Sequence, residues 1–141
     1  MSTSAAARRF FEDIWSEGRL DLVDELFAPE YVGHPSGLEE TVLGPEGVRE
    51  YIGRLREGFP DLIVTVDDQV AEDTKVATRW TARGTHDGEL MGLDPTGRTA
   101  TVTGITVQRV GAGGRIIEGW TNWDTLGMLR QLGVAPQTAG R

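Results

Sequence analysis

The sequence contains no cysteine, which excludes a disulfide framework and thiolate metal ligands. Histidine is also scarce: only two of the 141 residues are histidines, too few for a multi-histidine metal centre. The glycine-rich phosphate loop, the dinucleotide-binding fingerprint and the HExxH zinc motif are all missing. We therefore expect no bound cofactor and no metal. Acid/base chemistry by carboxylates, histidines and bound water remains feasible.

Long apolar runs and an excess of positive charge are missing as well. No run approaches the roughly 18 apolar residues that a membrane span needs, and no signal-peptide pattern opens the sequence. Fourteen basic and 22 acidic side chains give a net charge of −8, which repels nucleic acid and anionic lipid. We expect a cytoplasmic protein without nucleic-acid or membrane partners. Small neutral or aromatic molecules remain as candidate ligands.

The length predicts a single domain spanning residues 1–141, large enough to bury a core without staples. No linker, internal repeat or low-complexity segment divides the chain. We expect an ordered core over about residues 5–134 and a frayed tail after it.

Apolar residues recur at helical spacing in three segments of the first half, residues 4–17, 19–27 and 45–59. Residues that end helices follow them, namely Gly18, Pro29 and Pro60. A short extended piece at residues 30–35 separates the second helix from a polar loop.

The second half changes to β-branched residues divided by turn signals, which is typical of antiparallel strands. The expected strands are residues 62–72, 75–87, 98–110 and 115–123, with a short closing helix after them. Together these elements predict an α+β fold. In it, a cone-shaped, curved antiparallel sheet wraps around the N-terminal helices and encloses a ligand cavity.

One strand carries apolar side chains on both faces. Val102 and Val110 fall on one face, whereas Ile105 and Val107 fall on the other. We expect one face to pack on helices and the other on a second subunit, which predicts a homodimer through the sheet.

The segment GWTNWDTLGMLRQLG, residues 119–133, is the first site candidate. Polar groups flanked by indole rings at a strand end suit an enclosed pocket, because aromatic rings exclude water. The segment supplies Trp120, Thr121, Asn122, Trp123 and Asp124. Asp124 has an equally good second interpretation as the N-cap of the closing helix.

His34 and His86 titrate near neutrality, so each is a candidate proton shuttle, although a lone loop histidine is more often structural. Arg79 is suited to hold a carbonyl or enolate, or to pair with a carboxylate on the sheet. Trp80 adds to the two tryptophans of the last strand, as part of a flat aromatic site or of the core. The remaining carboxylates of interest are interpreted as surface charge, namely Glu12, Asp13, Glu39, Glu40, Asp67 and Asp68.

Three segments carry a resemblance to a known family: GPEGVREYIGRLREGFPDL, TARGTHDGELMGLDPTGRTATVTGI and RIIEGWTNWDTLGMLRQLG. In this order they resemble the SnoaL-like polyketide cyclases of the nuclear transport factor 2-like superfamily, from about Ala7 to Gly133. The resemblance implies a cone-shaped α+β barrel with a deep cavity, usually dimeric. It also implies cofactor-free action on aromatic polyketide intermediates, as in antibiotic biosynthesis.

The resemblance also implies where the chemistry would lie. In the family's aldol cyclases it rests on an aspartate of the last long strand and a histidine of the neighbouring strand; Thr121 and Thr106 occupy these positions here. Asp124 and His86 match other polar residues of the family. Strict alternation along the strand puts Thr121 on the face opposite to Asp124, unless the strand ends or bulges first.

The leading hypothesis is an enzyme that acts on an enolisable aromatic ketone or ester by proton transfer and enolate stabilisation. An anthracycline-type hydroxylase, a relative that lacks the cyclase His/Asp pair, is the alternative within the family. A non-catalytic small-molecule-binding protein is the alternative of another class. The catalytic candidates are Asp124, His86 and His34. The substrate-binding candidates are Arg79, Trp80, Thr106, Trp120, Thr121, Asn122 and Trp123.

Overall fold

The computed structural model describes residues 2–36 and 39–135. Helices dominate the first half and strands the second, as the sequence predicts. The elements are α1 (Thr3–Arg9), η1 (Phe10–Ser16), η2 (Leu20–Leu22), α2 (Val23–Leu26), β1 (Phe27–His34), β2 (Val42–Leu43), α3 (Gly44–Gly58), β3 (Ile63–Glu72), β4 (Lys75–Thr85), β5 (Thr99–Val110), β6 (Ile116–Trp123) and α4 (Thr125–Gln131). No helix of this described part is long and apolar enough to cross a membrane.

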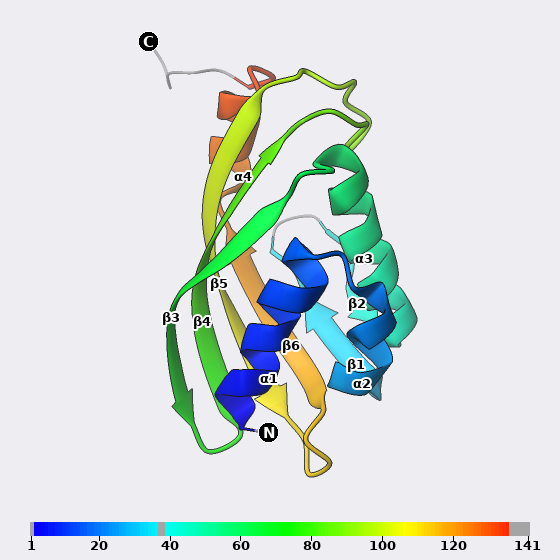
Figure 1. Ribbon diagram of the computed structural model, residues 1–141, viewed down its shortest axis with the longest axis vertical. Coiled ribbons are helices and arrows are strands. Elements are labelled where there is room, and N and C mark those ends of the chain that lie inside the picture. The colour runs from blue at the N-terminus through cyan, green and yellow to red at the C-terminus, as the bar shows by residue number, and fades with distance from the viewer. Residues whose placement is uncertain (1, 37–38, 136–141) are drawn as a thin grey trace.

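The six strands form one curved sheet in the order β2-β1-β6-β5-β4-β3, which is not closed into a barrel (Figure 1). The α+β class and the curved sheet around the N-terminal helices are therefore confirmed. One pair departs from the antiparallel expectation, because β1 and β6 run parallel. The chain between these two strands holds α3 and four strands, so the connection is long enough for a parallel pair.

The helices cover one face of this sheet. The first helical segment, α1 followed by η1, packs against β3 and β4, and α3 lies along β1 and β2 (Figure 1). The short α4 packs against β5. The apolar stripe of α3 explains its orientation, because Val48 and Ile52 are buried on the side that faces the sheet.

The predicted helix over residues 4–17 is confirmed, but its second half is wound as a π-helix. Residues five apart face each other in this wider winding. Phe10 and Trp15 accordingly meet edge to face, with ring centroids 6.2 Å apart. The π-helix therefore directs a set of aromatic rings towards the interior of the sheet.

The second predicted helix, residues 19–27, is only partly right. It is a 3₁₀ turn followed by the single turn α2, and the chain is already extended at Phe27, two residues before Pro29. A residue that precedes proline disfavours the helical conformation, so Ala28 cannot continue α2. Pro29 thus lies inside β1 and does not follow the end of a helix.

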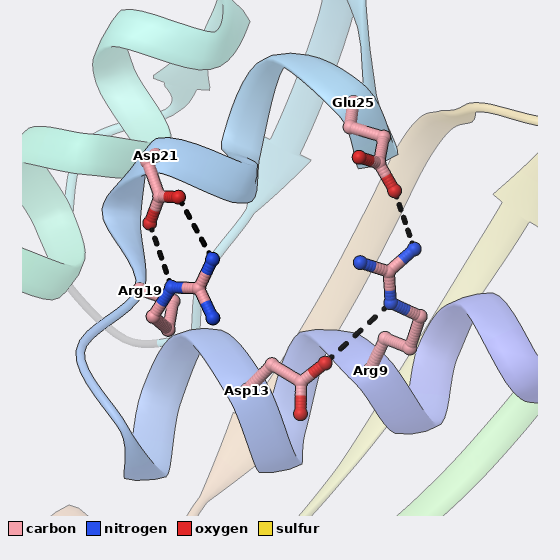
Figure 2. Close-up of polar contacts among 5 residues, drawn as sticks. All are labelled: Arg9, Asp13, Arg19, Asp21 and Glu25. Atoms are coloured by element: carbon pink, nitrogen blue, oxygen red, sulfur yellow. Dashed lines mark hydrogen bonds and ion pairs between the residues drawn. The ribbon is translucent and has the colours of Figure 1, made fainter.

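Exposed ion pairs connect the N-terminal helices (Figure 2). Arg9 of α1 bonds both Asp13 of η1 and Glu25 of α2, and Arg19 pairs with Asp21 of η2. These side chains are exposed or half-buried at the surface, so each pair contributes little free energy, at most about 1 kcal/mol. They orient the helices, and the buried aromatic core supplies the stability.

The two faces of the sheet differ sharply in burial. Trp80, Thr106 and Gln108 are buried on the face that meets the helices. On the other face, Ile105 is 50% exposed and Arg79 is exposed as well. The predicted apolar residues on both faces of β5 are thus confirmed, and the outer face is free of any other described element.

Candidate active site

A deep cavity lies between the inner face of the sheet and the helices η1 and α3. It holds about 1040 Å³ of space free of protein atoms, its open mouth included. Eight phenylalanine, tyrosine and tryptophan rings form much of its wall, namely Phe10, Phe11, Trp15, Tyr31, Tyr51, Phe59, Trp80 and Trp123. A concave, mainly apolar cavity with few polar groups is the usual form of a small-molecule site.

A chain of hydrogen bonds runs across the cavity wall. The indole N–H of Trp80 donates to Thr106 Oγ1 at 3.0 Å, and Thr106 Oγ1 lies 3.0 Å from Thr121 Oγ1. Register produces this arrangement, since Thr106 and Thr121 are directly paired on β5 and β6. Thr106 is buried and Thr121 only partly so. Either hydroxyl can donate; donation from Thr106 to Thr121 satisfies the buried Thr106 proton and leaves the proton of the partly exposed Thr121 available to a ligand.

Of the substrate-binding candidates, Trp80, Thr106, Thr121 and Trp123 line this cavity together. Arg79 and Asn122 do not, because they lie on the outer face. There they border a shallow depression together with Asp124. Arg79 is 57% exposed and lies 3.8 Å from Asp67, an ion pair on the surface.

Asp124 has the position of a helix cap. Its Oδ1 accepts the backbone N–H of Gly127 at 2.9 Å, at the start of α4. The side chain is exposed and does not line the cavity. Strand alternation persists to the end of β6, so no bulge redirects Asp124 towards Thr121.

His86 is fully buried behind the cavity wall. Its Nδ1 accepts the backbone N–H of Thr96 at 3.3 Å, which puts the ring proton of the neutral form on Nε2. Nε2 has no partner among the described residues, and the ring packs on Phe59 with centroids 5.6 Å apart. Phe59 lines the cavity and His86 does not, so His86 fastens the segment that leads from β4 to β5.

His34 borders the cavity, but its imidazole is engaged on the outer face. The ring stacks on Trp120 with centroids 5.6 Å apart, and Nε2 lies 2.9 Å from Glu118 Oε2. Arg109 bonds the other oxygen of Glu118 at 2.8 Å. Hydrogen bonds from Arg109 first, and then from His34, hold the pKa of Glu118 below its usual value.

Two polar residues at the cavity were not identified from the sequence. Gln108 is 1% exposed, and its Oε1 has no hydrogen-bond partner among the described residues. The hydroxyl of Tyr31 lies over Gly33 and Gly119, where any Cβ would come within 2.7 Å of it. Burial raises the pKa of this hydroxyl, so Tyr31 stays protonated. The signal for Gln108 was its spacing of two residues from Thr106 on one strand.

Glu39 was interpreted as surface charge, and the structure corrects this. Its side chain is half-buried, and Tyr51 Oη donates to its Oε2 at 3.4 Å. A residue in a polar loop gives no periodic signal of which tertiary partners will cover it. Among the described residues, no group of three acidic or histidine side chains is placed to hold a metal ion.

Replacing Asp124 with alanine tests its capping role. We expect the free energy of unfolding to fall by about 1 kcal/mol, because one N–H of α4 loses its acceptor. Asp124→Asn keeps an acceptor and should lower the free energy of unfolding by only a few tenths of a kcal/mol. Urea denaturation measures both variants. Equal stability of the alanine variant and the wild type would contradict the assignment.

Two substitutions on β5 should change stability in opposite directions. Gln108→Leu removes a buried, unpaired oxygen, so we expect the free energy of unfolding to rise by about 1 kcal/mol. Thr106→Val leaves the Trp80 N–H without an acceptor and should lower the same quantity by about 1–3 kcal/mol. Thermal denaturation of the ligand-free proteins measures both. A destabilised leucine variant would mean that Gln108 is a structural residue.

Comparisons with known proteins agree with this architecture. The family model of the SnoaL-like polyketide cyclases matches residues 5–132. Nogalonic acid methyl ester cyclase of Streptomyces nogalater is 30% identical over 122 residues, which cover 84% of this chain and 89% of that protein.

Two crystal structures from other streptomycetes are similar as well. IdmH of Streptomyces antibioticus, described as a candidate polyketide cyclase, is 38% identical, with a TM-score of 0.80 over 95% of this chain and 100% of the other. AclR of Streptomyces galilaeus, described as a candidate hydroxylase, is 26% identical. Its TM-score is 0.83, and the match covers 97% of this chain and 84% of AclR. The family match over nearly the whole described chain places the protein among the SnoaL-like polyketide cyclases, and it belongs to that family.

Proposed function

We propose that the protein is an enzyme that acts on an aromatic polyketide-type ketone or ester through a stabilised enolate, without a cofactor of its own. The observation that carries this proposal is the chain from Trp80 through Thr106 to Thr121 at the wall of an aromatic cavity. The cavity suits a flat, fused-ring molecule. The chain ends in a hydroxyl whose proton is free to bond a carbonyl oxygen.

This geometry favours the charge that develops during enolisation. When an α-proton leaves the substrate, the electron pair of the C–H bond moves onto the carbonyl oxygen. A donor that is already oriented, in a cavity with little water, stabilises that oxygen more strongly than a solvated hydroxyl would. The bonds from Trp80 to Thr106 and from Thr106 to Thr121 polarise each other and strengthen the terminal donor.

The ring-closing reaction then needs no change in oxidation state. The enolate carbon attacks a second carbonyl carbon of the same substrate, a C–C bond forms, and the second carbonyl oxygen takes up a proton. The threonines bind and stabilise the oxygen, but a threonine hydroxyl is a poor general base near neutrality. The group that moves the proton must therefore come from another part of the cavity.

A hydroxylase is the second candidate, and one observation favours it. The resemblance to the family's aldol cyclases aligns Thr106 and Thr121 with their histidine and aspartate, and the chain is similar over its length to AclR. This reaction would require dioxygen as oxidant and a two-electron reductant, and would insert one oxygen atom into an electron-rich aromatic ring. A binding protein without catalysis is the remaining candidate.

Exchange of α-protons on 1-tetralone, an enolisable bicyclic ketone, tests the proposal. We expect the wild type to accelerate deuterium uptake from D₂O, measured by NMR. Thr121→Val should lower the catalysed rate by about a hundredfold, because it removes the donor to the enolate oxygen. Thr121→Asp combined with Thr106→His should gain aldol cyclase activity if the chain is a diverged cyclase.

Three outcomes separate the candidate functions. Binding of the tetralone, seen as a change in tryptophan fluorescence, without any exchange would favour a binding protein. Oxygen uptake from isotope-labelled dioxygen into a hydroxyquinone, only with a reductant present, would favour the hydroxylase. Exchange that is unchanged in Thr121→Val would contradict the role of the hydroxyl chain.

We further propose a cytoplasmic homodimer that forms through the outer face of the sheet. Ile105, Ile63 and Val70 expose between 50% and 68% of their surface there. We expect sedimentation to show a dimer for the wild type and a monomer for Ile105→Glu, because a charge would be buried unpaired. Leu43→Glu, on exposed β2, is the control and should stay dimeric. A monomeric wild type would refute the proposal.

A further inference from the structure

A carboxylate stands beside the cavity next to two of its wall residues. Glu39 lies just before β2, and its partners come from two other elements, Tyr51 of α3 and Trp123 of β6. Tyr51 Oη donates to Glu39 Oε2 at 3.4 Å, and the side chain of Trp123 also hydrogen-bonds the carboxylate. Both partners line the cavity. Glu39 is therefore oriented by residues that a bound substrate would touch.

The electrostatics of this position differ from those of a surface glutamate. Burial is the largest effect and raises the pKa of Glu39, whereas the hydrogen bonds from Trp123 and Tyr51 and the charge of Arg54 lower it. Burial, and then the charge of Glu39, raise the pKa of Tyr51, so that its phenol stays protonated as a donor. A carboxylate with a raised pKa is a stronger base than a solvated one.

Glu39 lies beside the cavity without lining it, and the titratable groups that do line the cavity are less suited to proton transfer. The described residues that line it include only three such side chains, Tyr31, His34 and Tyr51. Both tyrosines have raised pKa values and stay neutral. The imidazole of His34 is engaged with Glu118 and Trp120 on the outer face. Glu39 is thus the carboxylate that can supply the missing base.

The spacing of the two polar positions fits a fused-ring substrate. Thr121 and Trp123 are two residues apart on β6 and face the same side, so they are separated by about 7 Å along the strand. Thr121 presents its hydroxyl at one position, and Glu39 adjoins Trp123 at the other. A ketone that bonds Thr121 and extends along β6 past Trp123 would therefore bring its rings towards Glu39.

We propose that Glu39 is the proton-transfer residue of this cavity, an inference that rests on the proposed enolate chemistry. Glu39 Oε2 takes the α-proton, and the electron pair of the C–H bond passes to the carbonyl oxygen at Thr121. After the enolate carbon has formed the new C–C bond, the Glu39 carboxyl returns the proton to the alkoxide oxygen formed at the second carbonyl. Tyr51 is a positioning residue, because it acts by holding the carboxylate.

Glu39→Gln tests this role in the 1-tetralone exchange assay. We expect the catalysed rate to fall by about a hundredfold or more, with the dissociation constant of 1-tetralone essentially unchanged. Glu40→Gln is the matched control, because its exposed carboxylate adjoins Glu39 in sequence. It should leave both quantities at the wild-type level.

Tyr51→Phe tests the role of Glu39 through the pH–rate profile, which would not shift if Glu39 were only a structural residue. The hydrogen bond from Tyr51 lowers the pKa of Glu39, so its loss should raise that pKa further. The exchange rate rises with pH as the carboxylate ionises. The rising limb of the pH–rate profile should therefore move to higher pH in this variant. An unmoved limb would contradict the role of Glu39.

The outcomes distinguish this inference from the proposed function. Exchange by the wild type that persists in Glu39→Gln overturns the inference and leaves the enolate chemistry standing. Binding without exchange by the wild type overturns both. If circular dichroism shows that Glu39→Gln is misfolded, Glu39→Asp replaces it, and its shorter side chain should lower the rate about tenfold. A full rate in Glu39→Asp would then count against the inference.

Discussion

The alternation of side chains along β4, β5 and β6 determines which residues can meet a ligand. Side chains two apart share a face, and the helices cover only one face of this sheet. Trp80, Thr106, Gln108, Thr121 and Trp123 therefore line one cavity, whereas Arg79, Asn122 and Asp124 lie on the far side. A shift of one residue in register would exchange the two sets completely. The bulges recorded in β3 and in the β5–β6 pair lie away from the pairing of Thr106 with Thr121, so the polar chain is preserved.

The cavity combines groups that a folded protein normally avoids. A buried carboxamide oxygen that finds no partner among the described residues, and a half-buried carboxylate beside the cavity, both oppose folding, because each loses water without full compensation. The aromatic wall offsets this cost by burying large apolar surfaces against each other. Natural proteins retain such local costs mainly at sites that contact ligands, where they trade stability for activity. The low polarity that makes Glu39 and Gln108 costly also strengthens every interaction they would make with a substrate.

Periodicity predicted most of this fold, because it reports burial of regular elements. The long strands begin and end within one or two residues of their predicted bounds, and the spacing in PEGVREYIGRLREGF located α3. Structural features that depend on contacts between distant parts of the chain could not be predicted from the sequence. The parallel pairing of β1 with β6 leaves no local pattern, and neither do the π-winding of η1 and the stacking of His34 on Trp120. Glu39 shows the same limit, because its hydrogen-bond partners Tyr51 and Trp123 are remote in sequence.

The parallel pair of β1 and β6 also affects the order in which the strands of the sheet can pair. β3, β4 and β5 can form their antiparallel contacts with strands that are close in sequence. Among the described strands, β1 has only the two residues of β2 as a neighbour until β6 has been synthesised. During translation, an edge that will become interior is therefore left open to other chains, and contacts of such long sequence separation form slowly. The wall of the ligand cavity includes Thr121 and Trp123, so the cavity is complete only when β6 has joined the sheet.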